Sequence, residues 1–145
     1  MKRSLLRVGI LAALVLGGVF VYQELNRENE PVSNLKTDAT ITAGSLIDAF
    51  TINESAANKK YLGKVLEVNG PLKAIEDAGA ITLVLGDSGI NKSVRCLLVE
   101  KTTGNKYNIN QELKVKGICT GVMNDPLLGL DINLDQCVVL QPETK

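Results

Sequence analysis

The chain has 145 residues, of which 45% are hydrophobic but only 3% aromatic, so any core must consist mainly of Val, Leu, Ile and Ala. This length suits one domain with a sizeable core and leaves little room for a second. The absence of His from the sequence excludes His general bases, His metal ligands and a Ser-His-Asp triad. Basic and acidic residues balance at 16 each, so net charge alone indicates no partner.

The N-terminus combines positive charge with an apolar run. Three basic residues precede the uninterrupted apolar stretch 8–22, namely Lys2, Arg3 and Arg7. A helix of this length is slightly short for a bilayer core of about 30 Å, but snorkelling of Arg7 extends its span. The pattern predicts a signal anchor over residues 1–22, a transmembrane helix that contacts the membrane through residues 5–22.

The alternative to an anchor is a cleaved signal peptide. No A-x-A cleavage site follows the run, and no Cys stands behind it to carry a lipoprotein anchor. The positive-inside rule then places residues 23–145 outside the cytoplasm. We therefore expect a single-pass protein of a bacterial inner membrane whose exported part has 13 basic and 16 acidic residues.

The exported part divides into two regions. Residues 23–42 are polar, charged and aperiodic, which is typical of a flexible linker. Residues 43–145 form the expected folded domain. Its first segment, 43–61, repeats apolar residues every three or four positions and so predicts one helix, with Thr42 or Ser45 near its N-cap.

After residue 63 the apolar period changes from helical to two, which predicts strands. Turns rich in Gly, Asn and Asp separate five such segments, at 64–75, 80–86, 93–99, 112–121 and 130–140. Five short strands at this spacing are typical of a small barrel or sandwich.

A set of residues in this order carries a family resemblance. It comprises Leu46, Phe50, Asn53, Glu54, Ala57, Tyr61, Gly63, Lys64, Val68, Gly70, Val94, Arg95, Cys96, Val115, Gly117, Cys119, Gly121, Leu134 and Cys137. With this pattern the chain resembles the bacterial tRNA_anti-like (tRNA-anticodon-like) OB-fold family over residues 43–140. The resemblance implies a mainly β fold, a five-stranded OB-fold-like Greek-key barrel preceded by one α-helix, to which the N-terminal transmembrane helix is added. Family members are small exported or membrane-tethered proteins, mostly of unknown function.

The sequence departs from this fold at one connection. An OB-fold usually has a helix between its third and fourth strands, whereas residues 100–110 are rich in Gly, Asn and Thr, which favours a loop. The leading helix is then the element expected to cap the barrel.

The fold of the family suggests nucleic-acid binding, but the residues argue against it. OB-folds that hold single strands use a basic groove and aromatic platforms, at about 1–3 kcal/mol per stacked base. The exported part carries a net charge of −3 and only three aromatic residues, two of them on the predicted helix face. Lys114 and Lys116 share one face of a strand, but two lysines make only a small phosphate contribution, and a solvated strand also explains them.

Strand alternation places Cys96 with Val94 and Leu98, and Cys119 with Val115, on predicted inward faces. If the last hairpin turns about Leu128, Cys119 faces Cys137 and the two form a candidate disulfide, which leaves Cys96 as an odd buried thiol. The alternative is that all three are small core residues. The sequence has no C-x-x-C pattern or His to support a catalytic thiol or a zinc site.

The motif search yields no catalytic or cofactor site. Residues 131–135 match the opening of a calcium loop, but Gln136 stands where Gly is required. In this segment the apolar Leu130, Ile132 and Leu134 alternate with polar residues that include Asp131 and Asp135, as in an amphipathic strand. No phosphate-binding Gly motif is present. The sequence therefore indicates no enzyme, no cofactor and no metal.

The loop at 126–129 places two apolar residues, Leu127 and Leu128, where polar residues are usual. They are candidate contacts with a protein partner or the membrane surface; the alternative is that they pack back over the barrel end. The sequence thus predicts a membrane-anchored, extracytoplasmic OB-fold protein, a non-enzymatic binding module for an unknown envelope protein or ligand. The alternatives are an oligosaccharide- or nucleic-acid-binding OB domain and a thiol redox protein.

Overall fold

A computed structural model describes residues 31–99, 106–127 and 129–140 of the chain. The chain separates into two units, Met1–Glu30 and Pro31–Lys145, and the second of these contains the folded domain. The predicted anchor at 1–22 lies outside the described residues. Within the described ranges, no helix is both long and apolar enough to cross a membrane.

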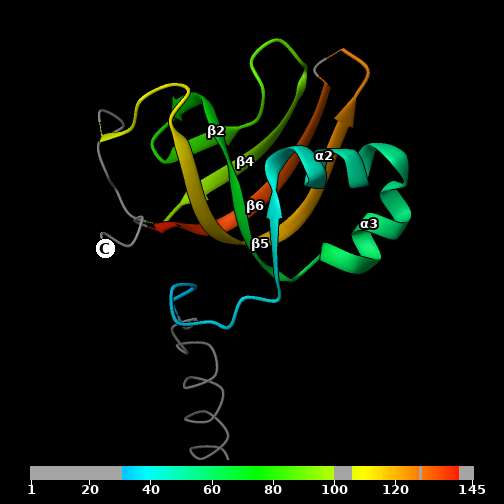
Figure 1. Ribbon diagram of the computed structural model, residues 1–145, viewed down its shortest axis with the longest axis horizontal. Coiled ribbons are helices and arrows are strands. Elements are labelled where there is room, and N and C mark those ends of the chain that lie inside the picture. The colour runs from blue at the N-terminus through cyan, green and yellow to red at the C-terminus, as the bar shows by residue number, and fades with distance from the viewer. Residues whose placement is uncertain (1–30, 100–105, 128, 141–145) are drawn as a thin grey trace, which may run out of the picture. The chain divides into compact units, whose positions relative to one another are not determined.

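Five strands form a closed barrel at the positions that the period-two pattern predicts (Figure 1). They are β2 (Val65–Asp77), β3 (Ile81–Leu85), β4 (Lys92–Leu98), β5 (Glu112–Asp125) and β6 (Gly129–Leu140). The sheet order is β2-β3-β4-β6-β5, and β5 pairs again with β2 to close the barrel. All of these pairings are antiparallel except β4–β6, which is parallel. This arrangement confirms the predicted mainly β, OB-fold-like barrel.

Two short helices precede the barrel, where the sequence predicts one over 43–61. α2 spans Ala43–Ile52 and α3 spans Glu54–Tyr61. Between them Asn53 has an extended backbone, and its side-chain oxygen accepts a 3.0 Å hydrogen bond from the Ala56 backbone N–H. Asn is a preferred N-cap because its side chain satisfies a free N–H of the first helical turn. The expectation of a single helix is therefore wrong, because Asn53 starts a second one.

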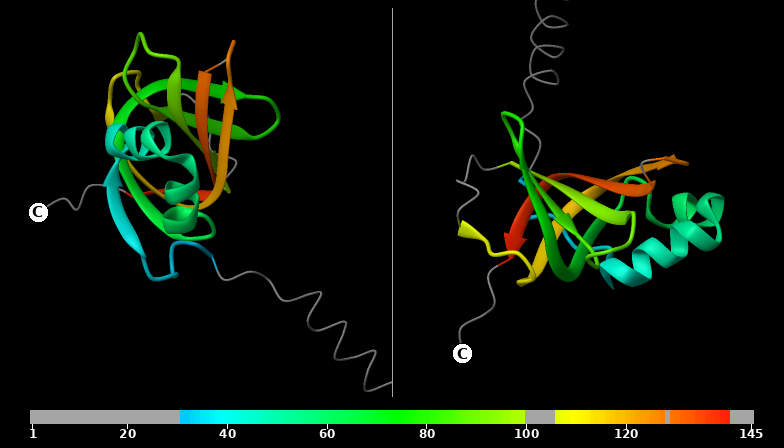
Figure 2. Two further views of the ribbon diagram at one scale, coloured as in Figure 1. Left: turned by 90° about the vertical axis from the view of Figure 1, so that its right-hand side faces the viewer. Right: turned by 90° about the horizontal axis from the view of Figure 1, so that it is seen from above.

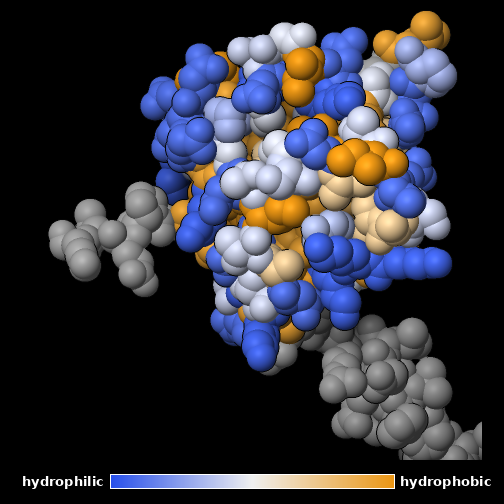
Figure 3. All heavy atoms as spheres, turned by 45° about the vertical axis from the view of Figure 1, so that its right-hand side comes forward, coloured by the Kyte–Doolittle hydropathy of each residue, from blue (hydrophilic) through white to orange (hydrophobic). Residues whose placement is uncertain are grey.

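α2 packs against the barrel strands β2, β4 and β6, and both helices lie together on one side of the barrel (Figure 2). Its buried apolar side chains include Leu46, Ile47 and Phe50. At its start, the Thr42 hydroxyl accepts a 3.2 Å hydrogen bond from the Ser45 backbone N–H, so Thr42 is the N-cap. On the face that bears the helices, small apolar areas are surrounded by hydrophilic side chains (Figure 3).

A sixth strand, β1 (Ala39–Thr42), falls within the region predicted as linker and runs parallel to β2. Ahead of it, Val32 is only 1% exposed. The Asp38 carboxylate accepts a 2.9 Å hydrogen bond from the Val65 backbone N–H, and the Asp38 N–H donates to the Val65 carbonyl. Residues 31–38, which we call the strap, are thus held against β2.

The connection between β4 and β5 is described only in part. Residues 106–111 contain no α-helix, only a 3₁₀ residue at Lys106 followed by turns, while residues 100–105 lie outside the described residues. The Asn110 backbone N–H donates a 2.7 Å hydrogen bond to the Leu72 carbonyl, and the Leu72 N–H donates to the Gln111 carbonyl. The end of this connection is therefore bonded to the middle of β2.

Candidate functional site

OB-folds bind ligands on the outer face of the second and third barrel strands and at the loops beside it. In this chain those strands are β3 and β4, and the neighbouring loops join β2 to β3 and β5 to β6. Along β4 the inward side chains are buried in the core. The outward ones are Arg95 and its neighbours Ser93 and Leu97, and β6 continues this face with Asp131 and Asn133. A ligand site in the position that OB-folds usually use would therefore lie on this outward face of β4 and β6.

Arg95 is the central charge of this face. Its guanidinium donates a 3.0 Å hydrogen bond to Glu76 of β2 and a second one to the other oxygen of the same carboxylate. On its other side a carboxylate oxygen of Asp131 lies 3.8 Å away, and Asp131 also accepts a hydrogen bond from Ser93. The hydrogen bond with Glu76 raises the pKa of Arg95. Two carboxylates thus compete with any phosphate for this guanidinium.

The aromatic side chains of the described residues do not supply the stacking platforms of single-strand binders. Phe50 and Tyr61 are buried, with their ring centroids 6.3 Å apart. Tyr107 is partly buried against the core. This agrees with the assignment of the two helical aromatics to the core.

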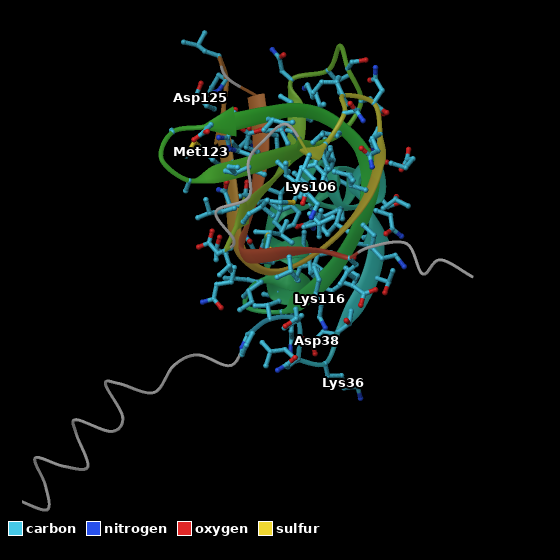
Figure 4. All side chains as sticks on the ribbon, turned by 90° about the vertical axis from the view of Figure 1, so that its left-hand side faces the viewer. Lys36, Asp38, Lys106, Lys116, Met123 and Asp125 are labelled. Atoms are coloured by element: carbon cyan, nitrogen blue, oxygen red, sulfur yellow. The ribbon has the colours of Figure 1, made fainter. Side chains whose placement is uncertain are left out.

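The two lysines that share a strand face have different surroundings. Lys114 is exposed, whereas Lys116 is only 7% exposed and points toward the strap (Figure 4). The Lys116 ammonium donates hydrogen bonds to the backbone carbonyls of Ser33, at 3.3 Å, and of Leu35. Lys116 is therefore a structural clamp and offers little to a phosphate.

All three cysteines are buried and free. The register places Cys119 opposite Leu134, not opposite Cys137 as the sequence predicts. The reason is that the hairpin closes with Asp125 opposite Gly129, one residue earlier than a turn about Leu128, and a bulge after Cys119 shifts the register again. The geometric premise of the predicted bridge is thus wrong.

The surroundings of two of these thiols, Cys119 and Cys137, raise their pKa values. Burial raises the pKa of Cys119. A hydrogen bond with the Cys96 side chain, together with burial, raises the pKa of Cys137. A thiolate is the reactive species in redox catalysis, so a raised pKa lowers reactivity at neutral pH. These environments are typical of core cysteines.

The β5–β6 loop carries the candidate contact residues. Leu127 is 88% exposed, so it does not pack back over the barrel, while Leu128 lies outside the described residues. The Asp125 carboxylate accepts a 2.7 Å hydrogen bond from the Leu127 backbone N–H, which shapes the turn. Gly129 approaches the β3–β4 turn so closely that an added Cβ would lie 1.9 Å from the Asn91 carbonyl oxygen. The turn thus presents Leu127 to solvent.

The apparent calcium motif is an amphipathic strand, as predicted. Leu130, Ile132 and Leu134 are buried and alternate with the acids along β6. Asp131 is engaged by Ser93 and Arg95. No three His, Cys, Asp or Glu side chains of the described ranges form a group that could hold a metal ion.

The sequence profile of the tRNA_anti-like family matches residues 1–131, which is most of the chain. The chain belongs to the tRNA_anti-like family. No curated protein sequence matches it significantly.

The tRNA_anti-like barrel is similar to a solved structure from Klebsiella pneumoniae subsp. pneumoniae MGH 78578, a protein described as a candidate nucleic acid-binding lipoprotein. The TM-score is 0.54 at 16% sequence identity, and the match covers 79% of this chain and 98% of the other. At this identity the likeness shows a shared fold, and a fold does not by itself determine a ligand.

Sequence reasoning missed one part of this tRNA_anti-like site, the ion pair between Glu76 and Arg95. The sequence places Glu76 just beyond a predicted strand, but β2 continues to Asp77 and brings the Glu76 side chain within reach of Arg95. Glu76 lies opposite Thr82, and Thr82 lies opposite Leu97. The alternation of apolar and polar residues does not show how β2, β3 and β4 are aligned with one another. No local signal in the sequence could therefore have identified the Glu76–Arg95 ion pair.

Proposed function

We propose that this tRNA_anti-like protein is a non-enzymatic binding module that contacts an envelope protein through its β5–β6 loop. In this proposal residues 5–22 anchor it in a bacterial inner membrane, with the barrel outside the cytoplasm. The observation that carries it is the exposure of Leu127, 88%, on a loop that OB-folds use for ligand contact. Exposed apolar side chains mark an interaction site where several of them gather in one place.

Two neighbouring residues extend this apolar end of the barrel. Met123, which precedes the turn on β5, is 58% exposed (Figure 4). Ile90 lies in the β3–β4 turn and is also exposed. That turn is joined to the start of β6 by a 2.9 Å hydrogen bond from the Leu130 N–H to the Asn91 carbonyl. Apolar residues with adaptable Met side chains suit a protein surface better than a polyanion.

Site-specific photo-crosslinking in intact cells tests the proposal. A photoreactive amino acid replaces Leu127 in one variant and Ile52 in another, because Ile52 is equally exposed, at 83%, but lies on α2. We expect one protein adduct from position 127 and none from position 52. Leu127→Ser should then weaken binding of the purified partner at least about tenfold, a difference of about 1.4 kcal/mol, while Ile52→Ser leaves it unchanged. No adduct at position 127, or equal adducts at both positions, would refute this interface.

The membrane placement has its own test. Mass spectrometry of the protein from its native membrane reports the N-terminus, and protease added outside the inner membrane reports the side on which the barrel lies. An intact N-terminus with an accessible barrel supports the anchor. A chain that starts near Gln23 indicates a cleaved signal peptide, and a protected barrel contradicts export.

Nucleic-acid binding is the second candidate, favoured by the description of the Klebsiella neighbour. It is tested by fluorescence anisotropy with single-stranded DNA and RNA oligonucleotides at two salt concentrations. Since Arg95 is paired with two acids and Lys116 with the strap, we expect no salt-dependent binding. If the protein binds an oligonucleotide with an affinity that falls steeply as the salt concentration rises, nucleic-acid binding would be favoured over the protein-contact proposal.

A further inference from the structure

Exposed lysines gather around the strap, on the strap itself and on the end of α3. They are Lys36 of the strap, Lys59 and Lys60 in the last turn of α3, and Lys64, which precedes β2. None of them forms an ion pair with any residue that the structure describes. Lys64 is next to Val65, whose backbone is bonded to Asp38 of the strap in both directions. We call these four lysines the basic end.

The acids beside the strap already have hydrogen-bond partners. The Asp38 carboxylate accepts from the Val65 backbone N–H at 2.9 Å. Glu67, which lies opposite Lys116 in the β2–β5 pairing, accepts a hydrogen bond from the Thr37 hydroxyl. Among the described residues around the strap, positive charge therefore exceeds negative charge, although the exported part as a whole is negative.

The basic end and the β5–β6 loop lie at opposite ends of the barrel. Figure 4 shows Lys36 at one end, and Met123 and Asp125, which precede the turn of that loop, at the other. The strap and the last turn of α3 lie together at the end away from the loop (Figures 1 and 2). A surface that meets the basic end therefore leaves Leu127 free for another contact.

The strap shortens the tether between the barrel and the proposed anchor. The sequence pattern predicts a flexible linker over 23–42, but residues 31–42 are held to the barrel as the strap and β1. Only residues 23–30 then separate the barrel from the proposed membrane segment. A segment of this length spans at most about 30 Å when fully extended. The strap end therefore stays within this distance of the membrane surface.

We propose that the basic end docks on the anionic phospholipid surface of the membrane that holds the anchor, with the β5–β6 loop turned away from it. This inference rests on the anchor in the proposed function. Lysines near an anionic lipid surface are attracted to it within about one Debye length. The tether has three acids and one base, so the attraction has to come from the barrel. A docked barrel presents Leu127 to a partner that extends outward from the membrane.

Lipid quenching in vesicles tests the docking. The full chain is reconstituted in phosphatidylcholine vesicles with or without phosphatidylglycerol as the anionic lipid, and headgroup-labelled lipids quench fluorophores near the surface. A fluorescent amino acid replaces the exposed Asn34 of the strap in one protein and Leu127 in another. We expect stronger quenching at 34 in anionic than in neutral vesicles, and little at 127 in either. High salt should remove the difference, because it screens exposed charges.

Two matched double variants make the result specific. Lys36→Gln combined with Lys64→Gln should shift the balance between docked and free barrel at least about tenfold toward the free form. Lys92→Gln combined with Lys106→Gln removes the same charge elsewhere, since Lys92 lies opposite Leu130 at the start of β6. This second variant should leave the quenching at 34 unchanged.

The same vesicles distinguish the ways in which the inference can fail. Protein that an alkaline carbonate wash removes would overturn the anchor and the docking with it. Protein that stays in the membrane but is quenched equally at 34 in neutral and anionic vesicles, or as strongly at 127 as at 34, would overturn the docking alone. Equal quenching at 34 together with oligonucleotide binding that the Lys36 and Lys64 variant loses would assign these lysines to nucleic acid instead.

Discussion

The ammonium of Lys116 on β5 is bonded to the backbone carbonyl of Leu35, 81 residues earlier in the chain. It also donates to the Ser33 carbonyl at 3.3 Å. A buried ammonium is tolerated where protein acceptors replace its water, and here two backbone carbonyls do so. The strap therefore belongs to the folded domain, and Lys116 anchors its middle while Asp38 bonds its end to β2.

Lys116→Met tests this clamp. Met keeps much of the apolar stem but removes the donors, so two carbonyls lose their partner and the free energy of unfolding should fall by about 1–3 kcal/mol. Lys114→Met, at the exposed position of the same strand face, should change it by less than about 0.5 kcal/mol. Urea denaturation measures both, and hydrogen exchange should speed up in the strap of the Lys116 variant only. Equal effects of the two substitutions would contradict the clamp.

Gly117→Ala should destabilise the barrel, because the new Cβ would lie 2.4 Å from the Cys137 sulfur. Overpacking of this kind costs about 1–3 kcal/mol. Gly44→Ala is the matched control: it lies in α2 with nothing within 4 Å of the new Cβ. There the substitution should stabilise by about 0.5–1 kcal/mol, since Ala favours helix. Thermal unfolding of both variants gives the signs, and a stable Gly117→Ala protein would show that the sulfur can move at little cost.

Asn53→Ala should lower stability by about 1 kcal/mol, because the Ala56 N–H loses its side-chain acceptor. Asn53→Asp keeps an oxygen in the same place and should retain most of the stability. Urea midpoints compare the two variants. If both behave alike, the break between α2 and α3 does not depend on the cap.

Stability of the reduced protein should fall with rising pH above about 8.5, the ordinary pKa of a thiol. The folded pKa values of Cys119 and Cys137 are raised, so the folded chain keeps protons that the unfolded chain releases. The stability that these two thiols contribute is fully present below the thiol pKa of the unfolded chain. It is lost as the pH rises above that value toward the pKa of the folded protein. Denaturant midpoints from about pH 7 to 9.5 measure it, and Cys137→Ala should flatten the slope. A midpoint independent of pH in the wild-type protein would contradict the raised values.

Local sequence pattern predicted most of the secondary structure of the barrel. The segments 80–86 and 93–99 became Ile81–Leu85 and Lys92–Leu98, because alternation of apolar residues depends only on which side of a strand faces the core. The same logic failed at Asn53. Apolar spacing continues across that residue from α2 into α3, and only the backbone geometry of the cap shows that two helices are present.

The sequence by itself determined an aliphatic core, five strands, a family and the prominence of Leu127 as an apolar residue in a turn. Only the tertiary structure decided that Lys116 is buried under the strap and that Cys119 lies opposite Leu134 instead of Cys137. The physical reason is that burial and pairing of these side chains depend on strand register and on segments up to 81 residues away. A bulge of one residue moves every later side chain to a new partner, and no local pattern of apolar and polar residues records it.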